Sequence, residues 1–110
     1  MREYVLTDFS AAAREKLENF LKEMGWSAGL DDLYWLPVPP EALSELQRAH
    51  ADCRPHVTAL ELTGDGVRME LLVRARNNLR CDCIAYATPE QAVKIIGCLH
   101  DILASLDIDC

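Results

Sequence analysis

The chain contains 110 residues, half of them apolar and 26% charged, and its formal net charge is −7. This length predicts a single domain over residues 1–110 that buries roughly two-thirds of its unfolded surface and folds without disulfides or a metal. The acidic balance argues against binding to nucleic acid or to anionic membranes. No segment has the roughly 20 consecutive apolar residues of a membrane span.

Two further features predict a cytoplasmic protein. The N-terminal residues lack the apolar run of a secretory signal. The chain also has five cysteines, and an odd number is more typical of a reducing compartment than of a disulfide framework. We expect Cys110, at the C-terminus, to be exposed.

The first predicted element after the N-terminus is an amphipathic helix. Residues Arg2–Thr7 could form a strand of their own or lead directly into this helix. Either Asp8 or Ser10 can cap it, and Gly25 ends it. Its predicted apolar stripe consists of Ala13, Leu17, Phe20, Leu21 and Met24.

A short strand and a second helix are expected next. Residues Leu33–Val38 form a short apolar run that ends in prolines, which predicts an edge strand or an extended segment because proline cannot donate to a sheet ladder. The second helix is expected from Pro40 to about His50, with Pro55 marking its latest end. Its predicted inward residues are Ala42, Leu43, Leu46 and Ala49.

The alternation of apolar and polar residues predicts a hairpin in the second half of the chain. Its strands are Thr58–Leu62 and Val67–Arg76, and a turn in which glycine supplies positive φ angles joins them. The two-residue loop could be Gly64-Asp65 or Asp65-Gly66. With the first loop, Leu62 pairs with Val67, Leu60 with Met69 and Thr58 with Leu71.

A third antiparallel strand is expected after a turn at Asn77-Asn78. A two-residue loop there pairs Leu71 with Ile84 and Met69 with Tyr86, and it places Cys81 and Cys83 on the opposite face. One extra loop residue would instead send the cysteines and the neighbouring alanines inward. We favour the first register because it buries the larger side chains. The inward residues of the second register would be Cys81, Cys83, Ala85 and Ala87.

The C-terminal helix has the clearest local signals. Thr88 and Gln91 have the spacing of a capping box, and Pro89 is tolerated at the first helical position. The apolar stripe that follows consists of Ala92, Ile95, Ile96, Leu99, Ile102, Leu103 and Leu106.

Together these elements predict a single two-layer α+β domain with the order α-β-α-β-β-β-α. Its three- to four-stranded, mostly antiparallel sheet contains a C-terminal β-meander and is packed by helices. The second face of the sheet would carry Leu72, Cys83 and Ala85 among arginines, which is rather apolar for contact with water. We therefore expect the second helix, or another copy of the chain, to cover it.

Cysteines and histidines form a candidate metal site. His50, Cys53 and His56 have the spacing H-x2-C-x2-H, and Cys81 and Cys83 form C-x-C on the predicted third strand. Zinc prefers four tetrahedral sulfur and nitrogen ligands, so one hypothesis is a zinc site at His50, Cys53 and His56 plus Cys81 or Cys83. The spacings match no familiar zinc motif, and the favoured interpretation is that the cysteines pack as small buried hydrophobes.

Arginines and aromatic residues form two candidate partner-binding features. Between Gly66 and Cys81 the chain has four arginines and one acidic residue. They are Arg68, Arg74, Arg76 and Arg80, and the last three flank the predicted Asn77-Asn78 turn. Such a tip could bind an acidic partner, a second copy or a phosphate group. Trp35, close to Trp26 and Tyr34, could add an exposed aromatic patch.

The function favoured by the sequence is a non-enzymatic interaction module that self-associates, as a homodimer, or binds a protein partner. The alternative is a small zinc-binding protein, and no other cofactor is expected. A second alternative is a cysteine-dependent enzyme with a Cys53–His56 or Cys98–His100 dyad, although the sequence has no nucleophile motif. Cys98 and His100 lie about 200° apart around a helix and could not share one metal ion.

Overall fold

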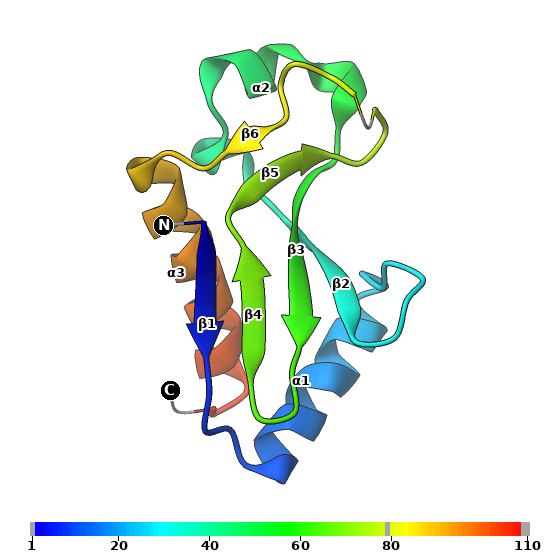
Figure 1. Cartoon of the computed structure of the whole chain (residues 1–110), viewed down its shortest axis with the longest axis vertical. Coiled ribbons are helices and arrows are strands. Elements are labelled where there is room, and N and C mark those ends of the chain that lie inside the picture. The colour runs from blue at the N-terminus through cyan, green and yellow to red at the C-terminus, as the bar shows by residue number, and fades with distance from the viewer. Residues whose placement is uncertain (1, 79, 109–110) are drawn as a thin grey trace.

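The computed structural model describes residues 2–78 and 80–108, in which two strands alternate with two helices before four consecutive strands and a last helix follow (Figure 1). The described residues form an antiparallel sheet and three α-helices, so the α+β class is confirmed. They contain six strands, however, and not three or four. In chain order the elements are β1 (Glu3–Leu6), α1 (Ala11–Glu23), β2 (Leu33–Pro37), the 3₁₀ turn η1 (Pro40–Ala42), α2 (Glu45–Ala49), the 3₁₀ turn η2 (Ala51–Cys53), β3 (His56–Leu62), β4 (Val67–Glu70), β5 (Leu72–Ala75), β6 (Ala85–Tyr86) and α3 (Pro89–Ser105).

Strand β3 lies at the centre of the sheet. Leu60 pairs on one side with Tyr34 of β2 and on the other with Met69 of β4, so β2 is an edge strand as predicted. Further along its length, β3 pairs with β5. Strand β1 then adds to the outer edge of β4, and β6 adds to that of β5. All five pairings are antiparallel.

The predicted strand Val67–Arg76 is divided into β4 and β5 at Leu71. The pairs Leu62–Val67 and Leu60–Met69 are present, but Val57 lies opposite Arg74, so the register changes by two residues and Thr58 does not pair with Leu71. At the break, the Leu71 N–H donates to the Arg2 carbonyl, and the Leu71 carbonyl accepts from the Ala87 N–H, both at 2.8 Å. The bend therefore lets β4 pair with β1 and β5 pair with β6.

The predicted third strand is shorter and lies in a different place. Only Ala85–Tyr86 is extended, and Tyr86 pairs with Leu72 where we expected Met69. Tyr4 of β1 occupies the position opposite Met69. Both predicted registers are therefore wrong, because β1 takes the edge of β4 and leaves only β5 for the returning chain.

The helix ends follow from local capping. In α3, Thr88 and Gln91 form the predicted capping box, with Pro89 in the first turn. In α1, Ser10 is the cap, since its hydroxyl accepts from the Ala13 N–H at 3.0 Å. The remaining candidate, Asp8, adopts a left-handed backbone with φ of 68° in the loop before it.

The predicted helix from Pro40 to His50 is interrupted. Leu43 is extended, which ends η1, and Ser44 then starts α2 with a second capping box to Gln47. Because the helix begins again after Ser44, the residues of α2 point in other directions than they would in one continuous helix from Pro40. As a result Leu46 is 50% exposed and Ala49 is also exposed, contrary to the prediction, while Gln47 is buried. Ala42 and Leu43 are buried as predicted.

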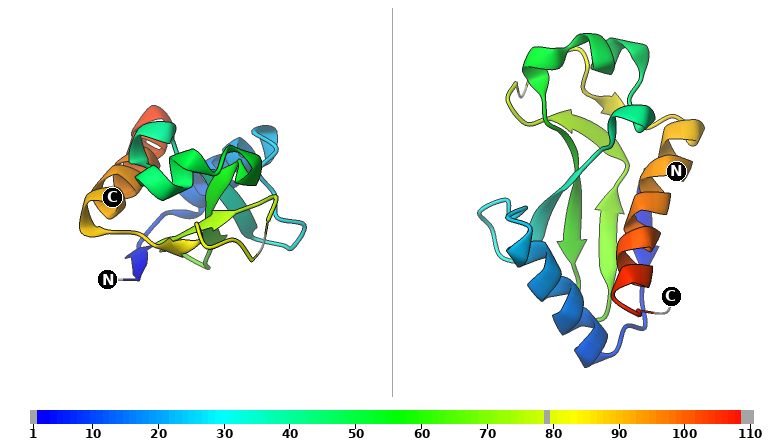
Figure 2. Two further views of the ribbon diagram at one scale, coloured as in Figure 1. Left: turned by 90° about the horizontal axis from the view of Figure 1, so that it is seen from above. Right: turned by 180° about the vertical axis from the view of Figure 1, so that it is seen from behind.

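Helices α1 and α3 lie on the same face of the sheet, and α2 lies at one end of it (Figure 2). Between these two layers the apolar side chains of alternate strand residues meet the buried stripes of both helices. The fully buried side chains include Leu17 and Leu21 of α1, Ile95, Leu99 and Leu103 of α3, and Leu60, Val67, Met69, Leu71 and Val73 of the sheet.

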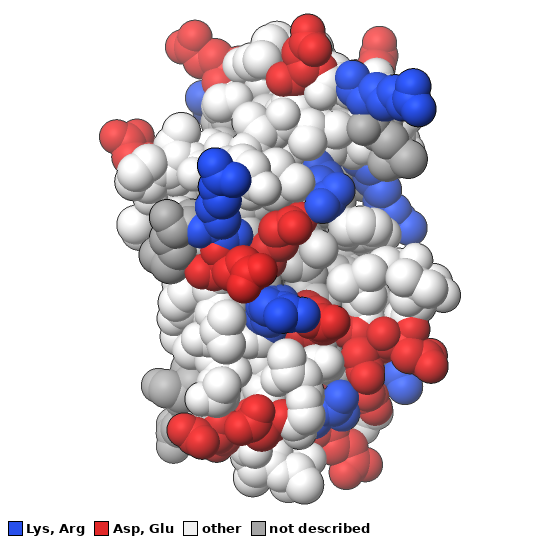
Figure 3. Space-filling model, in the orientation of Figure 1, with Lys and Arg blue, Asp and Glu red and all other residues white. Residues whose placement is uncertain are grey.

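The other face of the sheet is uncovered and carries charged side chains of both signs (Figure 3). Arg68 pairs with Glu61 across β3 and β4, and Arg74 pairs with Glu70 at 2.7 Å. The prediction of an apolar second face is therefore wrong. Helix α2 does not cover this face either, since it lies at one end of the sheet (Figure 2).

The backbone at the end of β1 lies so close to Gly66 that replacing this glycine should destabilise the protein. Gly64 and Gly66 do not have the positive φ angles that we expected. A Cβ atom at Gly66 would nevertheless meet the carbonyl group of Leu6 and the Cα of Thr7, which are backbone atoms that cannot rotate away. We expect Gly66→Ala to destabilise the protein by about 1–3 kcal/mol in urea unfolding.

Gly64→Ala is the matched control for this variant. A Cβ atom at Gly64 has no neighbour within 4 Å, and the residue lies in the same turn. Its effect should stay within roughly 0.5–1 kcal/mol of the wild type. Equal stabilities of the two variants would contradict the close approach of β1.

Candidate metal centre

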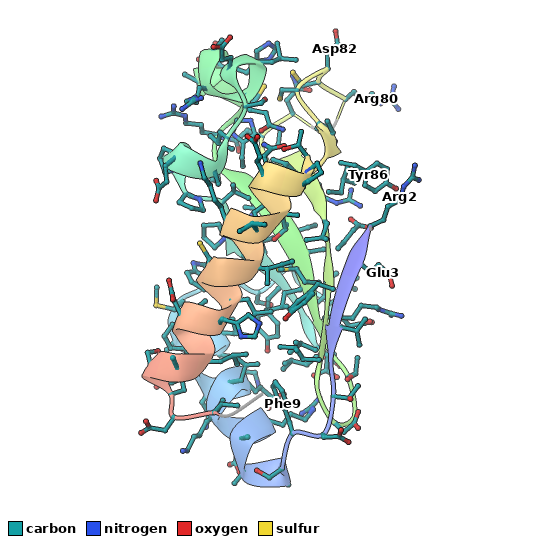
Figure 4. All side chains as sticks on the ribbon, turned by 90° about the vertical axis from the view of Figure 1, so that its left-hand side faces the viewer. Arg2, Glu3, Phe9, Arg80, Asp82 and Tyr86 are labelled. Atoms are coloured by element: carbon teal, nitrogen blue, oxygen red, sulfur yellow. The ribbon has the colours of Figure 1, made fainter. Side chains whose placement is uncertain are left out.

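Four side chains gather at the end of the molecule that carries α2. They are His50, Cys53, Cys81 and Cys83, and their ligand atoms all lie within 4.8 Å of one another. His50 and Cys53 come from the segment before β3, and the two other cysteines come from the loop after β5. Figure 4 labels Asp82, which lies between Cys81 and Cys83 at this end.

The sheet pairing brings these two segments together. His56, the first residue of β3, lies opposite Ala75, the last residue of β5. The chain just before β3 must therefore run beside the chain just after β5. The contact is reinforced by a hydrogen bond from the Arg76 N–H to the Pro55 carbonyl at 3.1 Å. A second bond runs from the Asn77 side-chain amide to the Arg54 carbonyl.

A tight turn orients His50 toward Cys53. His50 ends α2, and the Cys53 N–H donates to the His50 carbonyl at 3.0 Å within the 3₁₀ turn η2. This geometry leaves the His50 Nδ1 3.9 Å from the Cys53 Sγ. The spacing H-x2-C thus presents one nitrogen and one sulfur from a single turn.

Cys81 and Cys83 lie in a turn, not on the third strand that we expected. The Ile84 N–H donates to the Cys81 carbonyl at 3.1 Å, so the chain reverses over these residues. Cys81 Sγ lies 2.9 Å from His50 Nδ1. Cys83 is 1% exposed and packs with Cys53 and Ala75 in a small apolar cluster separate from the main core.

The environment of each sulfur shifts its acidity. The backbone N–H of Cys83 donates a hydrogen bond to Cys81 and lowers the pKa of that thiol to about 7. Burial raises the pKa of the Cys83 thiol to about 12. A side-chain hydrogen bond with Cys81 raises the pKa of Cys53. Only a cation, which binds the thiolate form, would bring all three sulfurs into the deprotonated state at neutral pH.

No protein-family model, curated protein or solved structure matches this chain. The arrangement of donors in the centre therefore has to be interpreted on its own chemistry. Three sulfurs and one imidazole nitrogen are the donor set of a tetrahedral zinc site. A surface hollow of about 460 Å³ borders His50, Cys53 and Cys81, and it would give an ion access to the donors.

The second histidine of the predicted site lies beside the cluster and not in it. His56 is 2% exposed, and its Nε2 is 3.6 Å from the Cys83 Sγ. Burial lowers the pKa of this imidazole. The sequence hypothesis joined His56 to one of the two C-x-C cysteines, whereas the four-residue cluster contains both cysteines and omits His56.

Two buried glutamines, whose place in the centre the sequence interpretation missed, connect it to α3. Gln47 donates from Nε2 to the Cys83 carbonyl at 3.0 Å. Gln91 donates from Nε2 both to the Gln47 side-chain oxygen at 2.9 Å and to the Ala42 carbonyl at 3.0 Å. Both residues also complete a capping box. The Ser44-x-x-Gln47 spacing was the available signal, because it marks a helix start.

The residues predicted to bind a partner are spread over the molecule. Arg68 and Arg74 are each paired with a glutamate of the open face. Arg76 and Arg80 are exposed and form no ion pair with any of residues 2–78 or 80–108. Trp35 is half-buried on β2, opposite Ala59. Partner binding through these residues stays a prediction.

The last Cys-x-His pair is separate from the centre. His100 lies on α3 with its Nε2 2.6 Å from the Tyr4 hydroxyl. Cys98 is half-buried, and burial raises the pKa of its thiol. Cys110 lies outside the described residues.

None of the described helices is long and apolar enough to cross a membrane.

Proposed function

We propose that this chain is a small zinc-binding protein in which His50, Cys53, Cys81 and Cys83 hold a structural Zn²⁺. The observation that carries the proposal is the convergence of four donor atoms within 4.8 Å of one another. Tetrahedral zinc with bonds of about 2.3 Å to sulfur and about 2.0 Å to nitrogen separates its ligand atoms by about 3.5–3.8 Å. The four side chains need only small adjustments to reach that geometry.

The donor set favours zinc over the hard cations. Thiolate sulfur suits zinc and other soft ions, whereas magnesium and calcium prefer oxygen ligands. Four protein donors also leave no open position for water or a substrate, which is typical of a structural site and not of a catalytic one. The ion would fasten the loop that carries Cys81 and Cys83 to the turn that carries His50 and Cys53.

This proposal develops the alternative that the sequence offered. An interaction module remains compatible with it, because a fastened loop could present Arg76 and Arg80 to an acidic partner. The side chains of those two arginines are exposed and form no ion pair within the described part of the chain, which supports that further step. Self-association through the open face has less support, because two of its arginines are already paired within the chain.

Metal analysis of protein purified without an affinity tag and under reducing conditions tests the proposal. We expect close to one Zn²⁺ per chain for the wild type, and little zinc for Cys81→Ser. Cys98→Ser is the matched control, because Cys98 lies on α3 outside the cluster. It should retain the full amount.

Zinc near zero in the wild type, even after reconstitution with Zn²⁺, would rule the proposal out. Equal zinc content in Cys81→Ser and Cys98→Ser would show instead that the ion binds elsewhere. Replacement by Co²⁺ adds a second readout, since cobalt bound to thiolate has a sulfur-to-metal charge-transfer absorption.

A further inference from the structure

His56 is the one buried histidine among the residues that the structure describes, and neither of its ring nitrogens belongs to the four-residue metal cluster. It begins β3 and is 2% exposed. Its Nε2 faces the Cys83 sulfur at 3.6 Å. Its Nδ1 has no hydrogen-bond partner among the described residues, although it is shielded from water. Such an arrangement requires a reason, because buried polar atoms normally have partners.

The position of the ring proton explains this arrangement. With the proton on Nδ1, a buried donor would lack an acceptor, and Nε2 could accept from a Cys83 thiol but would face the lone pairs of a Cys83 thiolate. With the proton on Nε2, the N–H points at the sulfur, and only an acceptor atom remains without a partner. The second tautomer becomes strongly favoured once Cys83 is a thiolate, since an N–H bond to an ionised acceptor is charge-assisted.

A bound metal would give such a donor a function. Three thiolates and one Zn²⁺ leave a net charge of −1 on the centre. Cys83 is the most deeply buried of the three sulfur ligands, at 1% exposure, and water cannot solvate its share of that charge. Gln47 binds the carbonyl of Cys83 and not its sulfur. His56 is therefore the side chain placed to stabilise this buried thiolate.

We propose that His56 is a positioning residue of the zinc centre, which donates its Nε2–H to the Cys83 thiolate and is not itself a metal ligand. This inference rests on the zinc-binding function proposed above. It assigns the two histidines of H-x2-C-x2-H different tasks, with His50 on the metal through Nδ1 and His56 on the ligand sulfur. Loss of such a supporting hydrogen bond typically weakens metal binding 10- to 100-fold.

The test compares three variants by competition titration with Zn²⁺ and by the absorption of the Co²⁺ form. His56→Leu removes the donor, and we expect zinc affinity to fall about 10- to 100-fold. We also expect its sulfur-to-cobalt charge-transfer band to shift, because a thiolate without the hydrogen bond is a stronger electron donor. His56→Gln can place an amide N–H near the position of Nε2, and should recover most of the affinity and the wild-type band.

Thr58→Val is the matched control for a general effect of altering a buried polar residue. Thr58 is two residues away on β3 and is 0% exposed, and its hydroxyl also has no partner in the described part of the chain. It is not a member of the metal cluster. We expect Thr58→Val to keep the zinc affinity and the cobalt spectrum of the wild type.

The possible results separate the two proposals. If the wild type binds zinc and His56→Leu matches its affinity and cobalt band, the proposed role of His56 is wrong while the zinc site stands.

¹¹³Cd NMR of the cadmium form reports the number of sulfur ligands. Loss of a nitrogen ligand in both His56→Leu and His56→Gln would overturn the inference in favour of direct coordination. If His56→Leu does not fold, the cobalt band of His56→Gln decides alone, and a band far from the wild type counts against it. No metal in the wild type removes both proposals.

Discussion

Replacing Cys83 with serine is expected to abolish the stabilisation of the protein by zinc. A ligand that binds only the folded state stabilises it by about 4 kcal/mol at a free concentration 1,000 times its Kd. Cys83 is 1% exposed at the junction of the two segments, and serine cannot replace its thiolate. Urea unfolding with added Zn²⁺ and with a chelator should therefore differ strongly for the wild type and little for Cys83→Ser.

Cys98→Ser is again the control for this measurement, because it removes a half-buried thiol from α3 without touching the cluster. It should keep the full difference between the zinc-bound and zinc-free unfolding curves. A wild type whose stability does not respond to zinc, or a Cys83→Ser variant that responds as strongly as the wild type, would contradict the proposed site.

Replacing Leu99 with alanine should cost about 2–5 kcal/mol of unfolding free energy. Leu99 is 0% exposed in the middle of α3, where the helix packs against the sheet. The truncation leaves a cavity that the surrounding strands cannot fill. Val93→Ala on the same helix is the control, since Val93 is 72% exposed and its truncation should change the stability by less than about 0.5 kcal/mol.

Urea unfolding of both variants with zinc held constant measures this difference. A loss below about 1 kcal/mol for Leu99→Ala would mean that α3 does not pack its Leu99 face against the sheet. A large loss for Val93→Ala would mean that its exposed face contacts something that the isolated chain lacks.

The two predictions address different parts of the molecule. The main core lies between the sheet and helices α1 and α3. Cys53, Ala75 and Cys83 form a second, smaller cluster near the end of the sheet. The main core is large enough for a chain of this size to fold without a metal. The proposed zinc would therefore stabilise one end of the domain, and the zinc-free protein should retain the main core.

Local features of the fold could be predicted from the sequence because the interactions that produce them span few residues. The capping box of Thr88 and Gln91 needs only four consecutive residues. The pairing of Leu62 with Val67 follows from a two-residue loop between two alternating segments. The prediction of one helix beginning at Pro40 was wrong because Leu43 is extended and a capping box of Ser44 and Gln47 starts α2 anew.

The strand boundaries depended on competition between segments far apart in the chain. Leu71 could continue a regular strand, and its sequence pattern favours that. Its N–H donates to the Arg2 carbonyl and its carbonyl accepts from the Ala87 N–H, and those two residues are 85 positions apart in the sequence. The sequence around Leu71 does not indicate that β1 pairs with the edge of β4. The position of β6 therefore could not be predicted.

The sequence by itself determined the α+β class, the hairpin from β3 to β4, the two long helices and the presence of sulfur and imidazole donors. Those features arise from periodicity, caps and composition, which act over neighbouring residues. Only the tertiary structure decided which donors meet. The opposition of His56 and Ala75 aligns the chain before β3 with the chain after β5, and this brings His50 and Cys53 to Cys81 and Cys83. Strand register is a long-range property, and a different pairing of β3 with β5 would shift these two flanking segments along each other and separate their donors.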